Sequence, residues 1–152
     1  MKNRTRTPFK ELKSEIELKS TKIETSDGTI SANLNITDST GLSFTKAGYF
    51  GATALTSGTS VSWDAGSNQS AVLVLGHNAT MGAATNQANG GVYILKVTQN
   101  SSPKTLSWNS NYKWPGNTAP TMTATGGAVD VFTFVSDGTY MYGSFSGSQN
   151  FT

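Results

Sequence analysis

Small polar residues and glycine make up nearly half of the chain, and this bias limits the folds open to it. Serine (19), threonine (22), asparagine (12) and glycine (16) supply 69 of the 152 residues. Hydroxyl and amide side chains compete for backbone hydrogen bonds in a helix, and glycine loses much backbone entropy there. Charged residues are only 13% of the chain, about half the usual share. The composition therefore predicts an all-β domain whose surface is kept wet by hydroxyls and amides.

From residue 23 onward the chain consists of short strand-like segments separated by turn signals. The uninterrupted apolar run 71–75 predicts a strand that is covered on both faces. Asp137-Gly138, between the apolar segments 129–135 and 140–145, predicts a two-residue hairpin loop. No internal helix and no repeat of fixed period is evident. We therefore expect an antiparallel β-sandwich or jelly roll with an extended N-terminal arm, and neither a solenoid nor a propeller.

The N-terminal segment differs in charge from the remainder of the chain. Residues 1–24 hold seven basic and four acidic side chains, whereas residues 25–152 hold four basic and five acidic ones. Such a division predicts a basic arm at 1–24 and a β-sandwich domain at 25–152. A short helix after Pro8 and an alternating strand after Glu15 both fit the arm, and we favour an extended arm with one helical turn. The residues expected to bind a partner are the following: Lys2, Arg4, Arg6, Phe9, Lys10 and Leu12.

The sequence shows no cysteine, no secretory signal and no membrane-spanning segment. The chain has no cysteine, so disulfides and thiolate metal sites are excluded. Met1-Lys2-Asn3-Arg4 is a basic beginning without an apolar stretch behind it, unlike a secretory signal. No segment approaches the roughly 18 apolar residues of a membrane helix. We expect synthesis in a host cytoplasm and no membrane partner.

The chain offers few groups for catalysis or metal binding. His77 is the only histidine, and no Gly-x-Ser-x-Gly, phosphate-loop or dinucleotide motif is found. Asp130 alone among the acids of the domain lies inside an apolar strand segment. It is either a functional carboxylate or, as we favour, a buried structural acceptor or a subunit-contact residue. We expect no enzyme activity, no cofactor and no metal site.

We do not expect nucleic acid as a partner. Tyr112-Lys113-Trp114 places aromatic rings beside a cation, as a stacking platform for bases would. The domain nevertheless has one more acidic than basic residue, so it lacks a broad basic footprint. We favour a structural role in which these aromatic side chains close the end of the sandwich.

The second half of the chain carries short motifs in a defined order: Val92-Tyr93-Ile94-Leu95, Leu106-Ser107-Trp108, Lys113-Trp114-Pro115-Gly116, Ala119-Pro120-Thr121, Ala128-Val129-Asp130-Val131, Ser136-Asp137-Gly138-Thr139-Tyr140 and Asn150-Phe151. In order and spacing this series resembles a module of tailed-bacteriophage virion proteins, over about residues 71–151. The resemblance implies a β-sandwich, typically trimeric, that occurs in capsid-associated proteins and at the ends of tail fibres. It implies no catalytic residues. The positions that we assign to the structural motif are Trp108, Trp114, Pro115, Gly116, Asp130, Asp137 and Gly138.

Within a virion, two roles fit the chain. A capsid decoration (cement) protein is short and holds the shell through an arm, whereas a tail fibre or receptor-binding adhesin carries a shaft before its tip. The basic arm and the absence of a shaft favour a homotrimeric decoration protein that binds the major capsid protein or another virion protein. The alternative is a short tail fibre that binds a receptor such as a carbohydrate.

Overall fold

The computed structural model describes residues 49–67, 69–144 and 150–151, and these form a nearly all-β structure. The predicted arm at 1–24 and its boundary with the domain lie outside the described residues. No α-helix is found in the described part, and none of it could cross a membrane as a helix. The described elements, in chain order, are β1 (Ala52–Ala54), β2 (Ser60–Val61), β3 (Ser70–Leu75), β4 (Ala79–Met81), β5 (Asn89–Gln99), β6 (Leu106–Trp108), β7 (Tyr112–Lys113), the short 3-10 turn η2 (Pro115–Asn117), β8 (Val129–Asp137) and β9 (Met141–Ser144).

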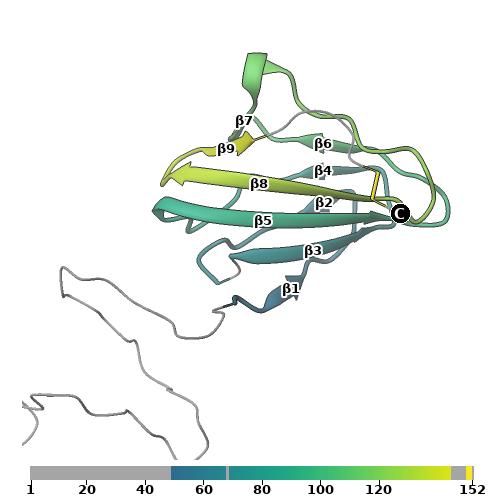
Figure 1. Cartoon of the computed structure of the whole chain (residues 1–152), viewed down its shortest axis with the longest axis horizontal. Helices are drawn as coiled ribbons and strands as arrows, with labels where there is room; N and C mark the ends of the chain where they lie inside the picture. The colour runs from purple at the N-terminus through teal and green to yellow at the C-terminus, as the bar shows by residue number, and fades with distance from the viewer. Residues whose placement is uncertain (1–48, 68, 145–149, 152) are drawn as a thin grey trace, which may run out of the picture. The chain divides into compact units, whose positions relative to one another are not determined.

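The strands form two sheets that share one hydrophobic core (Figure 1). The larger sheet has the order β1-β3-β5-β8-β9-β7, and the smaller has the order β2-β4-β6. Successive strands from β1 to β6 therefore belong to the two sheets in turn. Parallel neighbours need a long crossover connection, and from β1 to β6 each crossover passes through the opposite sheet rather than through a helix.

The antiparallel arrangement expected from the sequence is wrong for most strand pairs. Of the strand pairs that the structure describes, β5·β8 and β8·β9 are antiparallel, whereas β1·β3, β3·β5, β2·β4, β4·β6 and β7·β9 are parallel. Alternation of apolar and polar residues reports which face of a strand is buried, but the pattern is the same for either direction of the neighbouring strand. The back-and-forth winding of β1 to β6 also resembles a short solenoid, which we did not expect. Its coils are unequal, since Ala52 pairs with Ser70 but Ser70 pairs with Ile94, so no fixed period exists in the sequence.

The inward faces of both sheets supply the core. Every second residue of β8 is buried, from Asp130 to Ser136, and β5 shows the same alternation from Tyr93 to Gln99. Trp63, Phe132 and Phe134 are the largest side chains that are fully buried. The prediction that run 71–75 is covered on both faces is wrong within the single chain, because Val74 is 61% exposed.

The hairpin at Asp137-Gly138 is confirmed, with a shift of one residue. The Asp137 N–H donates to the Tyr140 carbonyl (3.4 Å), so the two loop residues are Gly138 and Thr139. Gly138 has a φ of +90°, which a side chain would make costly. Asp137 precedes the loop, where its Oδ1 accepts the N–H groups of Thr139 (2.8 Å) and Tyr140 (2.7 Å). These bonds hold the entry into β9 and so position the two tyrosines described next.

Candidate functional site

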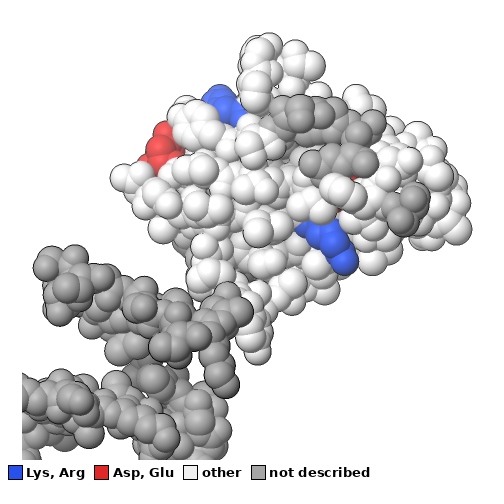
Figure 2. Space-filling model, in the orientation of Figure 1, with Lys and Arg blue, Asp and Glu red and all other residues white. Residues whose placement is uncertain are grey.

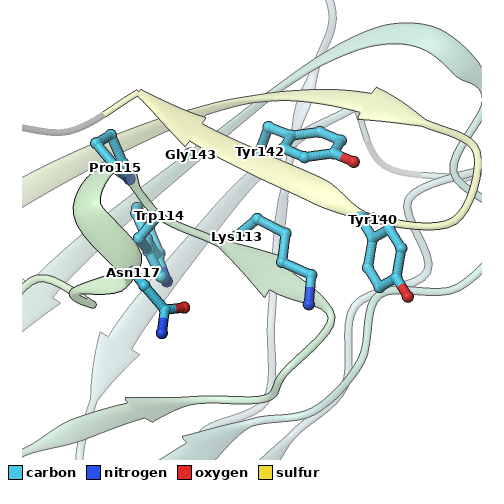
Figure 3. Close-up of a pocket in the computed structure, with 7 residues that line it drawn as sticks. All are labelled: Lys113, Trp114, Pro115, Asn117, Tyr140, Tyr142 and Gly143. Carbon is cyan, nitrogen blue, oxygen red and sulfur yellow. The ribbon is translucent and has the colours of Figure 1, made fainter.

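A hollow of about 560 Å³ lies at the β7 edge of the larger sheet (Figure 3). Two segments that are distant in sequence build it: β7 with the turn that follows, and β9 with the Tyr140 end of the hairpin before it. Three of its lining residues are aromatic and only one carries a charge. The lining consists of Lys113, Trp114, Pro115, Asn117, Tyr140, Tyr142 and Gly143. We call this feature the aromatic hollow.

The turn after β7 gives the hollow one of its walls. Trp114 is extended (φ −122°, ψ 148°), as the residue before a proline usually is, and Pro115 starts the 3-10 turn η2. Gly116 and Asn117 both adopt positive φ angles (63° and 56°). The residue types account for this turn, because the proline favours an extended Trp114 and glycine and asparagine tolerate the two positive φ angles.

Trp114 packs against a cluster of aromatic side chains beneath the hollow. Its ring lies 4.9 Å from Trp108 and 5.5 Å from Phe134, between centroids, with tilted or edge-on geometry. Trp108 also contacts Tyr112 (5.2 Å) and Phe132 (5.0 Å). Rings tilted in this way attract each other beyond their buried area. The floor of the hollow is consequently well packed, and Trp114 is held in one orientation.

Gly143 makes this packing possible from the opposite side. A Cβ atom built on Gly143 would overlap with the Trp114 ring, its nearest neighbour being Cζ3. The indole thus lies directly on the backbone of β9. The motif residue Trp114 and the unpredicted residue Gly143 act as one structural unit.

Two tyrosines form the opposite wall, and both keep part of their rings in solvent. Tyr140 is 39% and Tyr142 46% exposed, with centroids 6.4 Å apart and planes inclined at 71°. The Lys113 ammonium lies over the Tyr140 ring, 4.4 Å from its centroid, in a cation–π contact. The Tyr142 hydroxyl donates to Asp137 Oδ2 (2.9 Å). The hollow therefore has a corner of two aromatic faces with an ammonium beside it.

Asp137 carries the negative charge nearest to the two tyrosines, and hydrogen bonds within the hairpin fix its carboxylate. Hydrogen bonds from the backbone N–H groups of Tyr140 and Thr139, followed by that from the Tyr142 hydroxyl, lower the pKa of the Asp137 carboxyl. The same contact with Asp137 raises the pKa of the Tyr142 hydroxyl. Asp137 therefore stays ionised and engaged, and it does not pair with Lys113.

Asp130 lies away from the hollow, as a buried acceptor on β8. Its side chain is 1% exposed, and it accepts hydrogen bonds from the N–H and the hydroxyl of Thr123 and from the N–H of Asn150. These are the contacts of a buried structural acceptor, which is one of the two roles that the sequence favoured, the other being a subunit-contact residue. Of the other motif residues, Trp114 and Pro115 line the hollow, and Trp108 packs against Trp114. Gly116 lies between the lining residues Pro115 and Asn117, and Asp137 and Gly138 belong to the hairpin that precedes Tyr140.

A second, more polar hollow of about 370 Å³ is lined by hydroxyl groups and by Asp64. Asp64 accepts hydrogen bonds from Asn86, Ser67 and Gly66, and these contacts, that from Asn86 above all, lower the pKa of its carboxyl. His77 contacts Ser57 through Nδ1 at 3.3 Å, and among the described residues no carboxylate orients its ring. The pair ties two turns together and lacks the third member of a catalytic triad.

The described residues contain no group of three side chains that could ligate a metal ion. The predicted arm contacts (Lys2, Arg4, Arg6, Phe9, Lys10 and Leu12) lie outside the described residues. Sequence reasoning noticed the Lys113-Trp114 pair but missed Asn117, Tyr140, Tyr142 and Gly143. The available signal was the spacing of Tyr140 and Tyr142, which places both on the same face of a strand that follows a hairpin. What could not be read was the parallel β7·β9 pairing, which sets Lys113 opposite Tyr142.

Comparison with family models, with curated proteins and with solved structures finds no match for this chain.

Proposed function

We propose that this chain is a non-enzymatic structural protein of a tailed-bacteriophage particle, and specifically a capsid decoration protein that assembles as a homotrimer. The sequence resemblance over residues 71–151 supports the virion assignment. Two sheets over one core support a β-sandwich, and the parallel strand pairs favour it over a jelly roll, which is built from antiparallel strands. In this proposal the basic arm, residues 1–24, binds the shell.

The apolar outer face of the larger sheet is the observation that supports assembly into an oligomer. Cross-strand pairing aligns Val92, Val135 and Tyr142 in one row over β5, β8 and β9. Val74 and Ile94 lie on the same outward side of β3 and β5, and Val135 is 50% exposed. We call Val74, Val92, Ile94 and Val135 the valine face. Figure 2, which views this sheet from its outer side, shows few charged side chains.

The occupant of the valine face is proposed to be a second copy of the chain. The apolar run of β3 has the pattern of a strand buried on both faces, yet one of its faces is bare in the single chain. A closed ring of identical copies covers such faces in every subunit at once. The face is mostly apolar, which favours a close contact over a loosely hydrated one. The exposed Lys96 lies on the same side of the sheet, where it pairs with Val72 and Val131, so the proposed contact includes or borders one ammonium group.

A non-enzymatic role is supported by the state of the acidic groups. Asp64 and Asp137 are fixed in turns by several hydrogen bonds each, and Asp130 is buried on Thr123. None of the three points into the aromatic hollow. General acid–base catalysis needs a carboxyl group or imidazole within reach of the ligand.

Native mass spectrometry of the full chain tests the assembly. We expect a trimer that Val135→Lys converts to monomer, because a buried ammonium without a partner is costly. The control Ala124→Lys adds the same charge at an exposed site outside the valine face and leaves the trimer intact. A monomeric wild type at micromolar concentration, or a Val135→Lys trimer, would contradict the proposal.

The aromatic hollow favours a second candidate, a short tail-fibre or receptor-binding protein. Electron cryomicroscopy of particles separates the two roles. Copies that follow the capsid lattice support decoration, whereas copies confined to the tail support the second candidate.

A further inference from the structure

We propose that the aromatic hollow binds one ring of an acidic saccharide, with the tyrosines against the ring and Lys113 paired with its carboxylate. The hollow is concave, mostly apolar, and carries a small number of polar groups, as ligand sites do. Its volume of about 560 Å³ lies within the range of small-ligand pockets. The inference uses only β7, η2, the hairpin and β9, so it does not depend on the virion assignment.

The aromatic side chains supply the contact with the ring. A pyranose has apolar C–H faces and a polar rim, so it pairs with an aromatic face while its hydroxyl groups stay hydrated. Tyr140 and Tyr142 present such faces to solvent, and Trp114 closes the hollow behind them (Figure 3). A row of stacked bases needs parallel platforms, whereas the 71° angle between the tyrosine rings makes a corner that accepts one ring.

Lys113 selects the charge of the ligand. Its ammonium group rests on the Tyr140 ring, and no carboxylate of the described residues pairs with it. The nearest acid along the hairpin, Asp137, is already engaged by two backbone N–H groups and by the Tyr142 hydroxyl. A ligand carboxylate would therefore supply the anionic partner that the Lys113 ammonium group lacks among the described residues. The hydrogen bond between them would be charge-assisted, and such a bond is stronger than one between neutral groups.

Asn117 completes the polar set. It is exposed, lines the hollow, and is held at a positive φ angle at the end of η2. In Figure 3 the Lys113 side chain extends between Asn117 on one side and Tyr140 on the other. An amide offers both donor and acceptor atoms, which suits the hydroxyl groups at the rim of a sugar.

A nucleic acid fits these observations less well. The described residues carry three lysines (Lys96, Lys104 and Lys113) and three aspartates, and only Lys113 lines the hollow. Binding along a phosphate backbone requires several cations that follow the strand. A single ammonium group beside two inclined aromatic rings instead suits a sugar ring that bears one carboxylate.

Calorimetric titration of the full chain with an oligogalacturonate tests the proposal. The matched probe is the same oligomer with its carboxylates methyl-esterified, which keeps the ring and removes the charge. We expect the acidic form to bind about fivefold more tightly at low salt, and the difference to vanish at high salt. An indole NMR signal assigned to Trp114 should shift during the titration, while that of the fully buried Trp63 should not.

Substitutions separate the contribution of the Lys113 charge from that of the tyrosine rings. Lys113→Met should abolish the preference for the acidic form and keep the ester binding, whereas Lys104→Met, which removes a lysine elsewhere, should change nothing. Tyr142→Ala should weaken binding of both forms by about fivefold, and Tyr142→Phe should not. Tyr49→Ala removes an exposed aromatic ring just before β1, at the opposite edge of the sheet, and should have no effect.

Four results would overturn the proposal. They are no binding of either oligomer, equal binding of acid and ester, an unchanged preference in Lys113→Met, and equal binding of oligodeoxythymidylate that Lys113→Met weakens. The last would make the hollow a nucleic-acid site. If Tyr142→Ala does not fold, the comparison of Lys113→Met with Lys104→Met and the Trp114 indole signal still test whether the saccharide binds in the hollow.

Discussion

Thr123 donates to both carboxylate oxygens of Asp130, through its backbone N–H to Oδ2 and through its hydroxyl to Oδ1, each at 2.8 Å. The Thr123 carbonyl in turn accepts a hydrogen bond from Gln99 Nε2 (3.0 Å). Gln99 is the last residue of β5 and Asp130 lies in β8, so one threonine joins two neighbouring strands. The segment between η2 and β8 has no regular structure, and these buried bonds fix it against the core. A polar residue within an apolar strand thus holds a loop in place.

Removing part of this arrangement should cost stability. We expect Thr123→Val to lower the free energy of unfolding by about 1.5 kcal/mol, and Asp130→Asn by about 2 kcal/mol, because hydrogen bonds to buried charged groups are lost. Thr121→Val removes a hydroxyl from an exposed position nearby and should be neutral. Urea denaturation gives all three values. Equal losses for Thr123→Val and Thr121→Val would show that the contact with Asp130 contributes nothing.

Gly143 should be the least replaceable residue of β9. In Gly143→Ala the new methyl group must displace the Trp114 ring, and such overpacking costs about 1–3 kcal/mol. The tryptophan fluorescence spectrum should change with it, because Trp114 contacts Trp108. Gly51→Ala is the matched control, since no atom lies within 4 Å of a Cβ built there. An unaltered melting temperature in Gly143→Ala would mean that Trp114 moves freely.

The fold class was predictable from the sequence, but the strand directions were not. Composition and alternation identify β5 and β8 and the residues that they bury, and Asp137-Gly138 identifies the hairpin between β8 and β9. The β2·β4·β6 sheet has strands of only two or three residues, too short to show a period. The sequence of such a short segment does not predict that it pairs with the next-but-one strand. The pairing depends on how the long connections cross the core.

The same distinction applies to the aromatic hollow. Trp114, Pro115 and Gly116 are neighbours in sequence, so the turn that they form could be predicted from local rules. Tyr142 and Gly143 reach the hollow only through the parallel pairing of β7 with β9. The contact between Trp114 and Gly143 is tertiary, and a glycine within a strand gives no sign of which side chain covers it.

Acid should loosen the hairpin that carries the two tyrosines. The pKa of Asp137 is lowered in the folded protein, so its ionised form stabilises the turn at pH values above the ordinary aspartate pKa of about 3.9. This contribution is lost as the pH falls below that value and through the lowered pKa of the folded state. Amide hydrogen exchange at Thr139 and Tyr140 should therefore show reduced protection at low pH, after correction for intrinsic rates.

The control for this effect is Asp137→Asn, which keeps the Oδ1 acceptor for the two N–H groups and cannot ionise. Its turn should be looser than that of the wild type at neutral pH, and the difference should shrink with acidification. The hydrogen bond to Asp137 raises the pKa of the neighbouring Tyr142 hydroxyl, so this group stays protonated throughout the range. Protection that is equally pH-dependent in the variant would assign the effect to another group.

The basic arm should be separable from the folded domain. Among the residues that the structure describes, the first strand begins at Ala52 and the buried core begins at Val61, so we expect these strands and this core to persist when residues 1–24 are deleted. Lys2, Arg4, Arg6 and Lys10 lie among the first ten residues without an acid between them, and we propose the adjacent Phe9 and Leu12 as apolar anchors. Exposed charge pairs contribute only about 0–1 kcal/mol each and weaken with salt. Display of three arms on one trimer would multiply these small terms.

We therefore expect the chain without residues 1–24 to keep the circular dichroism and unfolding midpoint of the full domain but to lose binding to capsids that lack the protein. The full chain should bind such capsids more weakly at high salt than at low salt. Replacing Lys2, Arg4, Arg6 and Lys10 by alanine should reproduce the loss. The same replacement of Lys13, Lys19 and Lys22, which alternate with glutamates, should have a smaller effect because their charge is already balanced. A truncated chain that decorates as well as the intact one would remove the arm as the anchor and make the tail-fibre role the better explanation.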